Sequence, residues 1–303
     1  MYDAIVASAA AQSAIDSSSP PIVDPTAPDD SREDHQVESL SYFFPAHNEA
    51  ENIEQLVAEA LGELPRLAHR FEVICVDDGS TDGTGAIADR LAAEHPGVVR
   101  AVHHGVNQGY GAALRSGLGA ARYPLVCFTD GDRQFRIADL AGLLDRVREP
   151  VDQSSPALPD VVVGYRIKRA DPAVRLAYAR VYRACLRLLF GLQVRDVDCA
   201  CKLFRREALE DIRLTSGGAF LSAELLIKLR ALGRTVVEVG VPHHPRTAGR
   251  ASGADPRVVF RAVRDFWRLR LLLWARPREA LRTGEPALRP PDDTDTQAGG
   301  APA

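Results

Sequence analysis

The sequence predicts an α/β protein in which helices cover both faces of a mostly parallel sheet. Two observations predict this class: short apolar runs alternate with stretches of helical periodicity, and polar or glycine-containing turns separate them. The chain has 303 residues, of which 46% are hydrophobic and 26% are charged, so it can bury one large core. We therefore expect a single domain that binds ligands at the carboxyl ends of its strands.

Each expected element has its own pattern. Five short runs are apolar enough for strands, and in chain order they are LSYFFPA from residue 40, FEVICVD from 71, VVRAVHH from 98, PLVCFTD from 124 and PDVVVGY from 159. Helical periodicity follows the first four runs, at about 49–62, 83–94, 109–121 and 137–148. This alternation favours parallel strands joined by helical crossovers.

Composition changes near both ends of the chain. Residues 1–38 are rich in Ala, Ser, Pro and Asp, residues 279–303 are similarly polar, and we predict disordered tails there. The domain is expected over 39–255, followed by a basic amphipathic helix over 256–278. No stretch approaches the roughly 20 uncharged apolar residues of a membrane span, and the first residues lack the charged start of a secretory signal. We therefore expect a cytoplasmic protein.

The segment FTDGDRQF carries two carboxylates, Asp130 and Asp132, on either side of Gly131 and directly after an apolar run. Residues two apart in an extended chain point to the same side, so both carboxylates can converge on one hard cation. Gln134 is a further oxygen donor. A solvated acidic turn is the alternative, but the position at a strand end favours a site that holds Mg²⁺ or Mn²⁺ against a diphosphate.

Polar residues also follow the first two apolar runs. The segment FEVICVDDGSTDGT places Asp77 and Asp78 at the end of the second run, ahead of residues that suit a helix N-cap. The segment FFPAHNEAENI follows the first run, with Pro45 fixing the turn and Glu49 near the start of the helix. Helix capping or an ordinary polar turn explains part of both patterns, and this alternative stays open.

In this order, PAHNEAEN, VDDGSTDGT and TDGDRQF resemble the family 2 glycosyltransferases, which have the Rossmann-like GT-A fold. The likeness is greatest to the polyprenyl-phosphate hexose transferases, the group exemplified by dolichol-phosphate mannosyltransferase. It covers about residues 39–255. Each segment alone is moderately specific, whereas the ordered set with similar spacing is a strong signal.

The resemblance implies a sugar-nucleotide site. Four residues of the first two motifs would line the pocket for the base and ribose: Pro45, Glu49, Asp77 and Asp78. Asp130 and Asp132 would form the Asp-x-Asp motif that binds the metal and the diphosphate, with Gln134 beside them. The segment VPHHPRTAGRASG resembles a loop that closes over the diphosphate, and its contacts would come from Arg246, Arg250 and Ser252.

The resemblance also implies an acceptor site. In VVGYRIKRADP, Arg166 matches an arginine that approaches the acceptor phosphate, and in DVDCACKLFRR, Lys202 takes the place of a family arginine. The segment GAFLSAELLIKLRALG resembles the helix that opens near the acceptor, with Glu224 as its carboxylate. The family often has Ser-Gly-Phe-Arg where this chain has Cys-Ala-Cys-Lys at 199–202, and this departure concerns the acceptor.

The resemblance thus predicts a metal-dependent, inverting transfer of a hexose from a nucleotide sugar, of the GDP-mannose or UDP-glucose type, to a polyprenyl phosphate. The expected catalytic residues are Asp132, Arg166, Lys202 and Glu224. A phosphate monoester is already ionised near neutral pH and requires little base catalysis. A hydroxyl acceptor on a glycan or lipid would require a carboxylate such as Glu224 or Asp198. This second hypothesis stays open beside a third, a catalytically idle sugar-nucleotide-binding protein.

The net charge of −4 combines an acidic first half with a basic second half. In a helix over 257–274, four arginines fall in one stripe and apolar residues cover much of the remaining surface. The stripe consists of Arg257, Arg261, Arg264 and Arg268. Residues 173–190 have a similar pattern. Such helices suit the headgroup region of an anionic membrane. We expect peripheral association with the cytoplasmic face of the membrane, against the alternative of core-facing helices with solvated arginines. Nucleic acid is not an expected partner, because the acidic strand ends would repel its phosphates.

Overall fold

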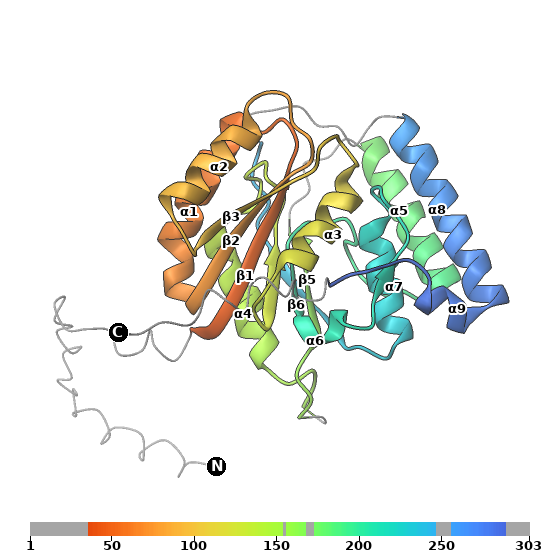
Figure 1. Ribbon diagram of the computed structural model, residues 1–303. Helices are drawn as coiled ribbons and strands as arrows, with labels where there is room; N and C mark the ends of the chain where they lie inside the picture. The colour runs from red at the N-terminus through yellow and green to blue at the C-terminus, as the bar shows by residue number, and fades with distance from the viewer. Residues whose placement is uncertain (1–35, 154–155, 168–172, 247–255, 289–303) are drawn as a thin grey trace, which may run out of the picture. The chain divides into compact units, whose positions relative to one another are not determined.

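The computed structural model of the chain describes residues 36–153, 156–167, 173–246 and 256–288 (Figure 1). A seven-stranded sheet has the order β3-β2-β1-β4-β6-β5-β8. Its strands are β1 (Val37–Ala46), β2 (Ala68–Asp77), β3 (Val99–His103), β4 (Leu125–Phe128), β5 (Val161–Arg166), β6 (Lys202–Arg205) and β8 (Val236–Val241). Neighbours are parallel except at β6, which is antiparallel to both β4 and β5. The predicted mostly parallel sheet is confirmed.

Helices connect the strands and pack on the sheet. They are α1 (Ala50–Leu67), α2 (Thr84–Glu94), α3 (Tyr110–Ala120), α4 (Leu140–Arg148, after a 3₁₀ turn at Ile137–Asp139), α5 (Ala173–Phe190), α6 (Arg206–Leu209), α7 (Leu221–Ala231), α8 (Pro256–Ala275) and α9 (Pro277–Arg282). Helices form in all of the stretches where the sequence predicts them. In the part of the chain that the structure describes, no helix has both the length and the apolar character that a membrane crossing requires.

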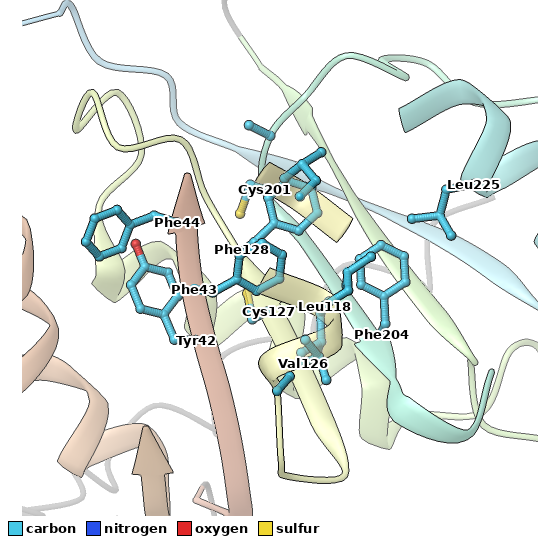
Figure 2. Close-up of a cluster of buried hydrophobic side chains, with 14 of the residues drawn as sticks. Tyr42, Phe43, Phe44, Leu118, Val126, Cys127, Phe128, Cys201, Phe204 and Leu225 are labelled. Carbon is cyan, nitrogen blue, oxygen red and sulfur yellow. The ribbon is translucent and has the colours of Figure 1, made fainter. Parts of the chain in front are cut away.

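A row of aromatic rings fixes the centre of the sheet (Figure 2). The rings of Phe43 on β1 and Phe128 on β4 stack with centroids 5.2 Å apart, and Phe128 and Phe204 on β6 stack at 6.2 Å. Successive strand residues point to opposite faces of a sheet. On the face of Phe43, helix α3 approaches so closely that a Cβ on Gly117 would lie 2.1 Å from the ring. The end of β4, where Asp130 follows, is therefore held firmly between β1 and β6.

The C-terminal part of the chain is ordered further than the sequence predicts. After α8 and α9, the short strand β9 (Glu285–Pro286) pairs antiparallel with β7 (Arg213–Leu214). Ala287 is fully buried, and its backbone N–H donates to the Ile212 carbonyl at 2.8 Å. The prediction of a disordered tail from residue 279 is therefore wrong for 279–288. The predicted N-terminal tail is likewise wrong at its end, because β1 begins at Val37, and the remaining tail residues lie outside those described.

Candidate functional site

The strand ends meet at one edge of the sheet, where Asp78 ties β2 to the start of α3. Its carboxylate accepts backbone N–H bonds from Gln108 at 2.9 Å and Gly109 at 2.8 Å, and it lies 2.6 Å from His104 Nδ1. The side chain is 3% exposed, so these partners occupy most of its hydrogen-bonding surface. Asp78 therefore orders the turn that precedes α3.

Asp77 makes a similar connection toward α2. It accepts the Ser80 N–H at 3.0 Å and lies 3.2 Å from His103 Nδ1. Burial alone would raise the pKa of Asp77, but the hydrogen bonds from Ser80 and His103 outweigh it and hold the pKa below its usual value. The other ring nitrogen of His103 lies 2.8 Å from Asp89 Oδ1. Asp77 stays ionised and braces the turn after β2.

Glu49, at the start of α1, belongs to a chain of charges that reaches Asp132. Arg246 Nη1 lies 3.5 Å from Glu49 Oε1, and Arg246 Nη2 lies 2.5 Å from Asp132 Oδ2. Burial raises the pKa of Glu49, against the lowering effect of the Asn52 hydrogen bond and the Arg246 charge. Arg246 thus links two of the predicted motifs through its guanidinium.

Asp130 is the partly buried carboxylate at the end of β4. Its Oδ1 accepts a hydrogen bond from the Tyr110 hydroxyl at 2.9 Å. Burial, together with the charge of Asp132, raises the pKa of Asp130 to about 6. Tyr110, Lys202 and Arg246 lower it again only in part. The Asp130–Asp132 pair therefore carries more negative charge than its neighbours neutralise.

Gly131 permits the two carboxylates to sit at this edge. A Cβ on this residue would lie 2.8 Å from the Pro45 carbonyl oxygen, so only glycine lets the turn pack against the end of β1. Gln134 closes the turn: its backbone N–H donates to Asp132 Oδ1 at 3.1 Å, and its side-chain amide donates to the His244 carbonyl at 3.2 Å. Gln134 thereby holds the segment that carries Arg246.

Arg166 forms a two-pronged ion pair with Asp196. Its Nε and Nη2 lie 2.6 and 2.8 Å from the two carboxylate oxygens. Asp196 is 6% exposed, so the pair is largely buried and holds the arginine in a fixed orientation. The structure places Arg166 at the end of β5, as the sequence predicts, with a structural partner that the sequence did not reveal.

Lys202 lies wholly inside the protein. Its ammonium donates to the Val197 and Cys199 carbonyls and to Ser222 Oγ, and it sits 5.6 Å from the centre of the Phe128 ring. Burial lowers its pKa, although nearby acidic groups counteract this. Because the side chain is 0% exposed, Lys202 secures the 197–199 turn, and its expected catalytic role stays a prediction.

Glu224 also has a structural partner rather than an open surface. Lys228, one helical turn later on α7, places its Nζ 2.9 Å from Glu224 Oε1, and both side chains are buried. Thr215 and Ser216 donate their backbone N–H groups to the two carboxylate oxygens at 2.9 and 2.7 Å. Burial alone would raise the pKa of Glu224, but Lys228 and these bonds lower it. Glu224 therefore braces the turn before α7, and its expected catalytic role stays a prediction.

The family model for glycosyl transferase family 2 matches residues 41–213, more than half of the chain. This range contains the ends of β1, β2 and β4 and the residues that converge there. The chain belongs to glycosyl transferase family 2. The predicted family is confirmed, and the protein is a glycosyltransferase.

Characterised relatives have similar sequences. The chain is 31% identical over 234 residues to polyprenol monophosphomannose synthase of Mycolicibacterium smegmatis, covering 74% of this chain and 85% of that protein. It is 33% identical over 203 residues to dolichyl-phosphate hexose transferase of Haloferax volcanii, covering 64% and 80%. A match to glycosyltransferase AglD of the same archaeon is 34% identical over 214 residues and covers 68% of this chain but only 33% of that longer protein.

Solved structures confirm the predicted GT-A fold. Mannosyl-3-phosphoglycerate synthase from Rubrobacter xylanophilus superposes with a TM-score of 0.60 at 21% identity, covering 84% of this chain and 78% of that one. Glucosyl-3-phosphoglycerate synthase from Mycobacterium tuberculosis, solved with Mg²⁺ and uridine diphosphate, gives 0.54 at 21% identity and covers 78% of each chain. At these identities the likeness concerns the fold alone.

The carboxylate pair of this family 2 glycosyltransferase fits a divalent cation. Among the described residues no three or more histidine, cysteine or acidic side chains form a ready metal cluster. Mg²⁺ in proteins commonly takes only one or two carboxylates and completes its shell with water and substrate phosphates. Two hard oxygen donors with too little positive charge around them, Asp130 and Asp132, match that requirement.

Several strand-end side chains were missed by sequence reasoning. The predicted aspartates are contacted by His103, His104 and Tyr110. The two histidines stand at the end of the third apolar run. The rule that ligands gather at strand ends, which found the other motifs, would therefore have found these histidines as well. Tyr110 lies between Gly109 and Gly111 at the start of α3. The predicted ligands Arg250 and Ser252 lie outside the described residues.

Replacing Asp130 with Asn is expected to stabilise the metal-free protein. A carboxyl whose pKa is raised to about 6 on folding binds more protons in the folded state, so the free energy of unfolding falls as pH rises from about 4 to 6. Asp130→Asn removes this dependence and raises the free energy of unfolding near neutral pH by up to about 3 kcal/mol, the free-energy equivalent of the rise in this pKa. Urea denaturation across pH measures it. Asp211→Asn, at a 78% exposed side chain, is the control, and a variant no more stable than wild type contradicts the account.

Replacing Glu224 with Gln is expected to destabilise the fold. The substitution keeps the size of the side chain but leaves Lys228 buried without its charged partner, which costs about 3–5 kcal/mol. Guanidinium denaturation measures the loss, and Glu207→Gln, on the exposed side of α6, is the matched control. If Glu224→Gln has the same free energy of unfolding as wild type but transfers no sugar, Glu224 acts in the transfer reaction instead.

Proposed function

We propose that this glycosyltransferase moves a hexose from a nucleoside-diphosphate sugar to a polyprenyl phosphate, with inversion at the anomeric carbon. The observation that carries the proposal is the charge-deficient pair of Asp130 and Asp132 beside Arg246 at the carboxyl edge of the sheet. Relatives named for polyprenyl- and dolichyl-phosphate sugar transfer support the acceptor class. The donor is a GDP- or UDP-sugar in this proposal.

In the proposed reaction an acceptor phosphate oxygen attacks the anomeric carbon. The bond from that carbon to the donor diphosphate breaks, and the nucleoside diphosphate leaves with its electron pair. Asp130 and Asp132 would hold Mg²⁺ or Mn²⁺, which when bound neutralises charge that grows on the leaving diphosphate. Arg246 lies at the same edge and supplies a second cation, and Glu49 and Gln134 orient it.

The acceptor chemistry is consistent with the way the buried acids are used. A phosphate monoester arrives already ionised, so no protein group has to remove a proton from it. Of the two carboxylates expected to serve a hydroxyl acceptor, Glu224 is committed to Lys228 and to the turn before α7, whereas Asp198 is exposed. The names of the relatives therefore carry the preference for a phosphate acceptor.

The supply of the acceptor from a lipid bilayer accounts for an exposed apolar surface on α5 and α8. These helices lie side by side (Figure 1), and Phe190 of α5 packs edge-on against Phe266 of α8 with centroids 5.0 Å apart. Large apolar side chains of both helices are exposed, among them Leu188 at 82%, Phe260 at 73% and Trp274 at 75%. The α5–α8 surface, as we define it, comprises Tyr178, Val181, Leu188, Val259, Phe260, Val263, Trp267, Leu271 and Trp274.

Exposed arginines accompany the α5–α8 surface: Arg180, Arg183, Arg187, Arg261, Arg264 and Arg268. Apolar and aromatic side chains mixed with arginine suit a membrane interface that carries anionic headgroups. We propose that this surface docks peripherally on an anionic membrane, at its cytoplasmic face. The lipid tail of the acceptor then stays in the bilayer while its phosphate reaches the protein.

Transfer is expected to depend on Asp132. Purified protein with Mg²⁺ or Mn²⁺, a panel of labelled GDP- and UDP-sugars and a polyprenyl phosphate should move label into the organic phase. Asp132→Asn should lower the rate by about 10²-fold or more, because the cation that stabilises the leaving group is lost. Asp211→Asn is the matched control. Label that reaches only a glycan or lipid hydroxyl, or no binding of any donor, contradicts the proposal.

Membrane docking is expected to require the exposed aromatic residues of α8. Phe260→Ser combined with Trp274→Ser should reduce binding to phosphatidylglycerol-containing vesicles by about tenfold or more, since burying one large apolar side chain is worth about 1.5–3 kcal/mol. High salt should release the wild type by screening its arginines. Leu158→Ser, at an exposed leucine outside the α5–α8 surface, is the control. Wild type that stays in the supernatant at low salt excludes the docking.

A further inference from the structure

The side chain of Arg261, on α8, lies near the carboxyl edge of the sheet. Helix α8 is anchored through Asp265, Phe266 and Leu269, which are 8%, 7% and 3% exposed, and Phe266 packs against Phe220 with centroids 5.8 Å apart. Arg261 lies one helical turn before Asp265, at the border between the buried and exposed sides of α8, because Asp265 is buried and Arg261 is exposed. Its side chain approaches the carboxyl edge of the sheet at Gly218 and Gly109.

Two glycine-rich segments meet the side chain of Arg261 at that edge. A Cβ on Gly218 would lie 3.3 Å from Arg261 Cδ, and a Cβ on Gly109 would lie 3.8 Å from Arg261 Nη1. The same construction on Gly109 meets the Gly217 carbonyl at 2.9 Å. The stem of Arg261 therefore crosses the turn before α7, and its guanidinium lies beside the first residue of the turn into α3.

The position beside Gly109 adjoins the reaction site directly. The next residue, Tyr110, donates its hydroxyl to Asp130, and Gly109 itself donates its N–H to Asp78. The turn that supports Arg261 is fixed by Glu224, which binds the N–H groups of Thr215 and Ser216 immediately before Gly217. A buried ion pair thus braces the surface across which Arg261 reaches the site.

The charge of Arg261 has no ion-pair partner among the residues that the structure describes. Across the described residues no carboxylate lies within ion-pair distance of it, whereas its neighbour Arg264 pairs with Asp265 at 3.1 Å. The start of α3 is already capped, because Asp78 accepts the N–H groups of Gln108 and Gly109. The guanidinium of Arg261 is therefore the group that can receive an anion here, and a phosphate offers it several acceptor oxygens.

We propose that Arg261 binds the phosphate of the polyprenyl-phosphate acceptor and positions it for attack on the donor sugar. The inference rests on the proposed acceptor and adds the residue that receives it. Arg261 belongs to the helix whose exposed side forms the α5–α8 surface, so a lipid phosphate that leaves the headgroup region meets this cation at the rim of the site. One helix thereby joins membrane docking to acceptor positioning.

A water-soluble acceptor separates acceptor binding from membrane binding. Citronellyl phosphate, a short isoprenyl phosphate, is titrated calorimetrically into the full-length protein without donor, and citronellol, its uncharged alcohol, is the ligand control. Arg261→Ala is expected to weaken binding of citronellyl phosphate by about tenfold or more, the usual worth of a hydrogen bond to a charged group. Arg261→Lys should recover part of the affinity, because it keeps the charge but not the paired N–H geometry.

Arg282→Ala is the matched control. It removes one positive charge from α9, where Arg282 is exposed and forms no ion pair with the residues that the structure describes. It should leave the affinity for citronellyl phosphate within about twofold of wild type, because a distant exposed charge is screened by salt. In transfer assays with the same acceptor, Arg261→Ala should raise the KM for acceptor and leave the KM for donor unchanged.

Three results would overturn the inference. They are equal affinity of wild type and Arg261→Ala for citronellyl phosphate, absence of binding by wild type, and a rise in the KM for donor alone. Because the titration contains no donor, it is independent of transfer. If Arg261→Ala loses binding of citronellyl phosphate but the wild type transfers no sugar, the phosphate site is supported and the proposed function is refuted. If the wild type transfers sugar normally and Arg261→Ala does so equally well, the proposed function is supported and the role of Arg261 is refuted.

Discussion

The site depends on one constraint: two carboxylates separated by a single glycine lie at a partly buried edge that has too little positive charge to neutralise them. Asp130 and Asp132 are forced together because β4 ends between β1 and β6, and the row of stacked rings from Phe43 to Phe204 fixes that position. The raised pKa of Asp130 is the electrostatic cost of this arrangement. We propose that a divalent cation offsets this cost, so that the geometry which weakens the metal-free protein would favour binding of metal and diphosphate.

Around this edge, most of the other ionised groups shape the chain rather than face a ligand. Asp77 and Asp78 order the turns into α2 and α3, Lys202 secures a turn through backbone carbonyls, and Glu224 with Lys228 braces the turn before α7. Charges of this kind are costly to bury and are retained only when every partner is present. They hold loops in the positions from which Arg246 and Arg261 reach the site.

Much of the fold and part of the site could be predicted from the sequence. The alternation of apolar runs and helical stretches predicts the sheet, and the rule that ligands gather at strand ends brings Asp78, Asp130 and Glu49 to one edge. The pairing of Arg246 with Asp132 could not be predicted, because residues separated by more than a hundred positions meet only through tertiary folding. The burial of Lys202, and the backbone partners that burial gives Lys202 and Glu224, could not be predicted from their neighbours in the sequence alone. For Glu224 a signal was present: α7 is apolar nearly all round, and a lysine four residues later points to a buried pair. The short pairing of β7 with β9 leaves no pattern, so the order of 279–288 was missed.

The most direct test of the central claim is the binding of Mn²⁺ to the purified protein with and without GDP or UDP, followed by electron paramagnetic resonance. The account predicts that the nucleoside diphosphate tightens Mn²⁺ binding in the wild type, and that Asp130→Asn and Asp132→Asn each abolish this effect while the variants stay folded. Equal Mn²⁺ binding by wild type and both variants would contradict it, because the carboxylates at the end of β4 would then hold no metal.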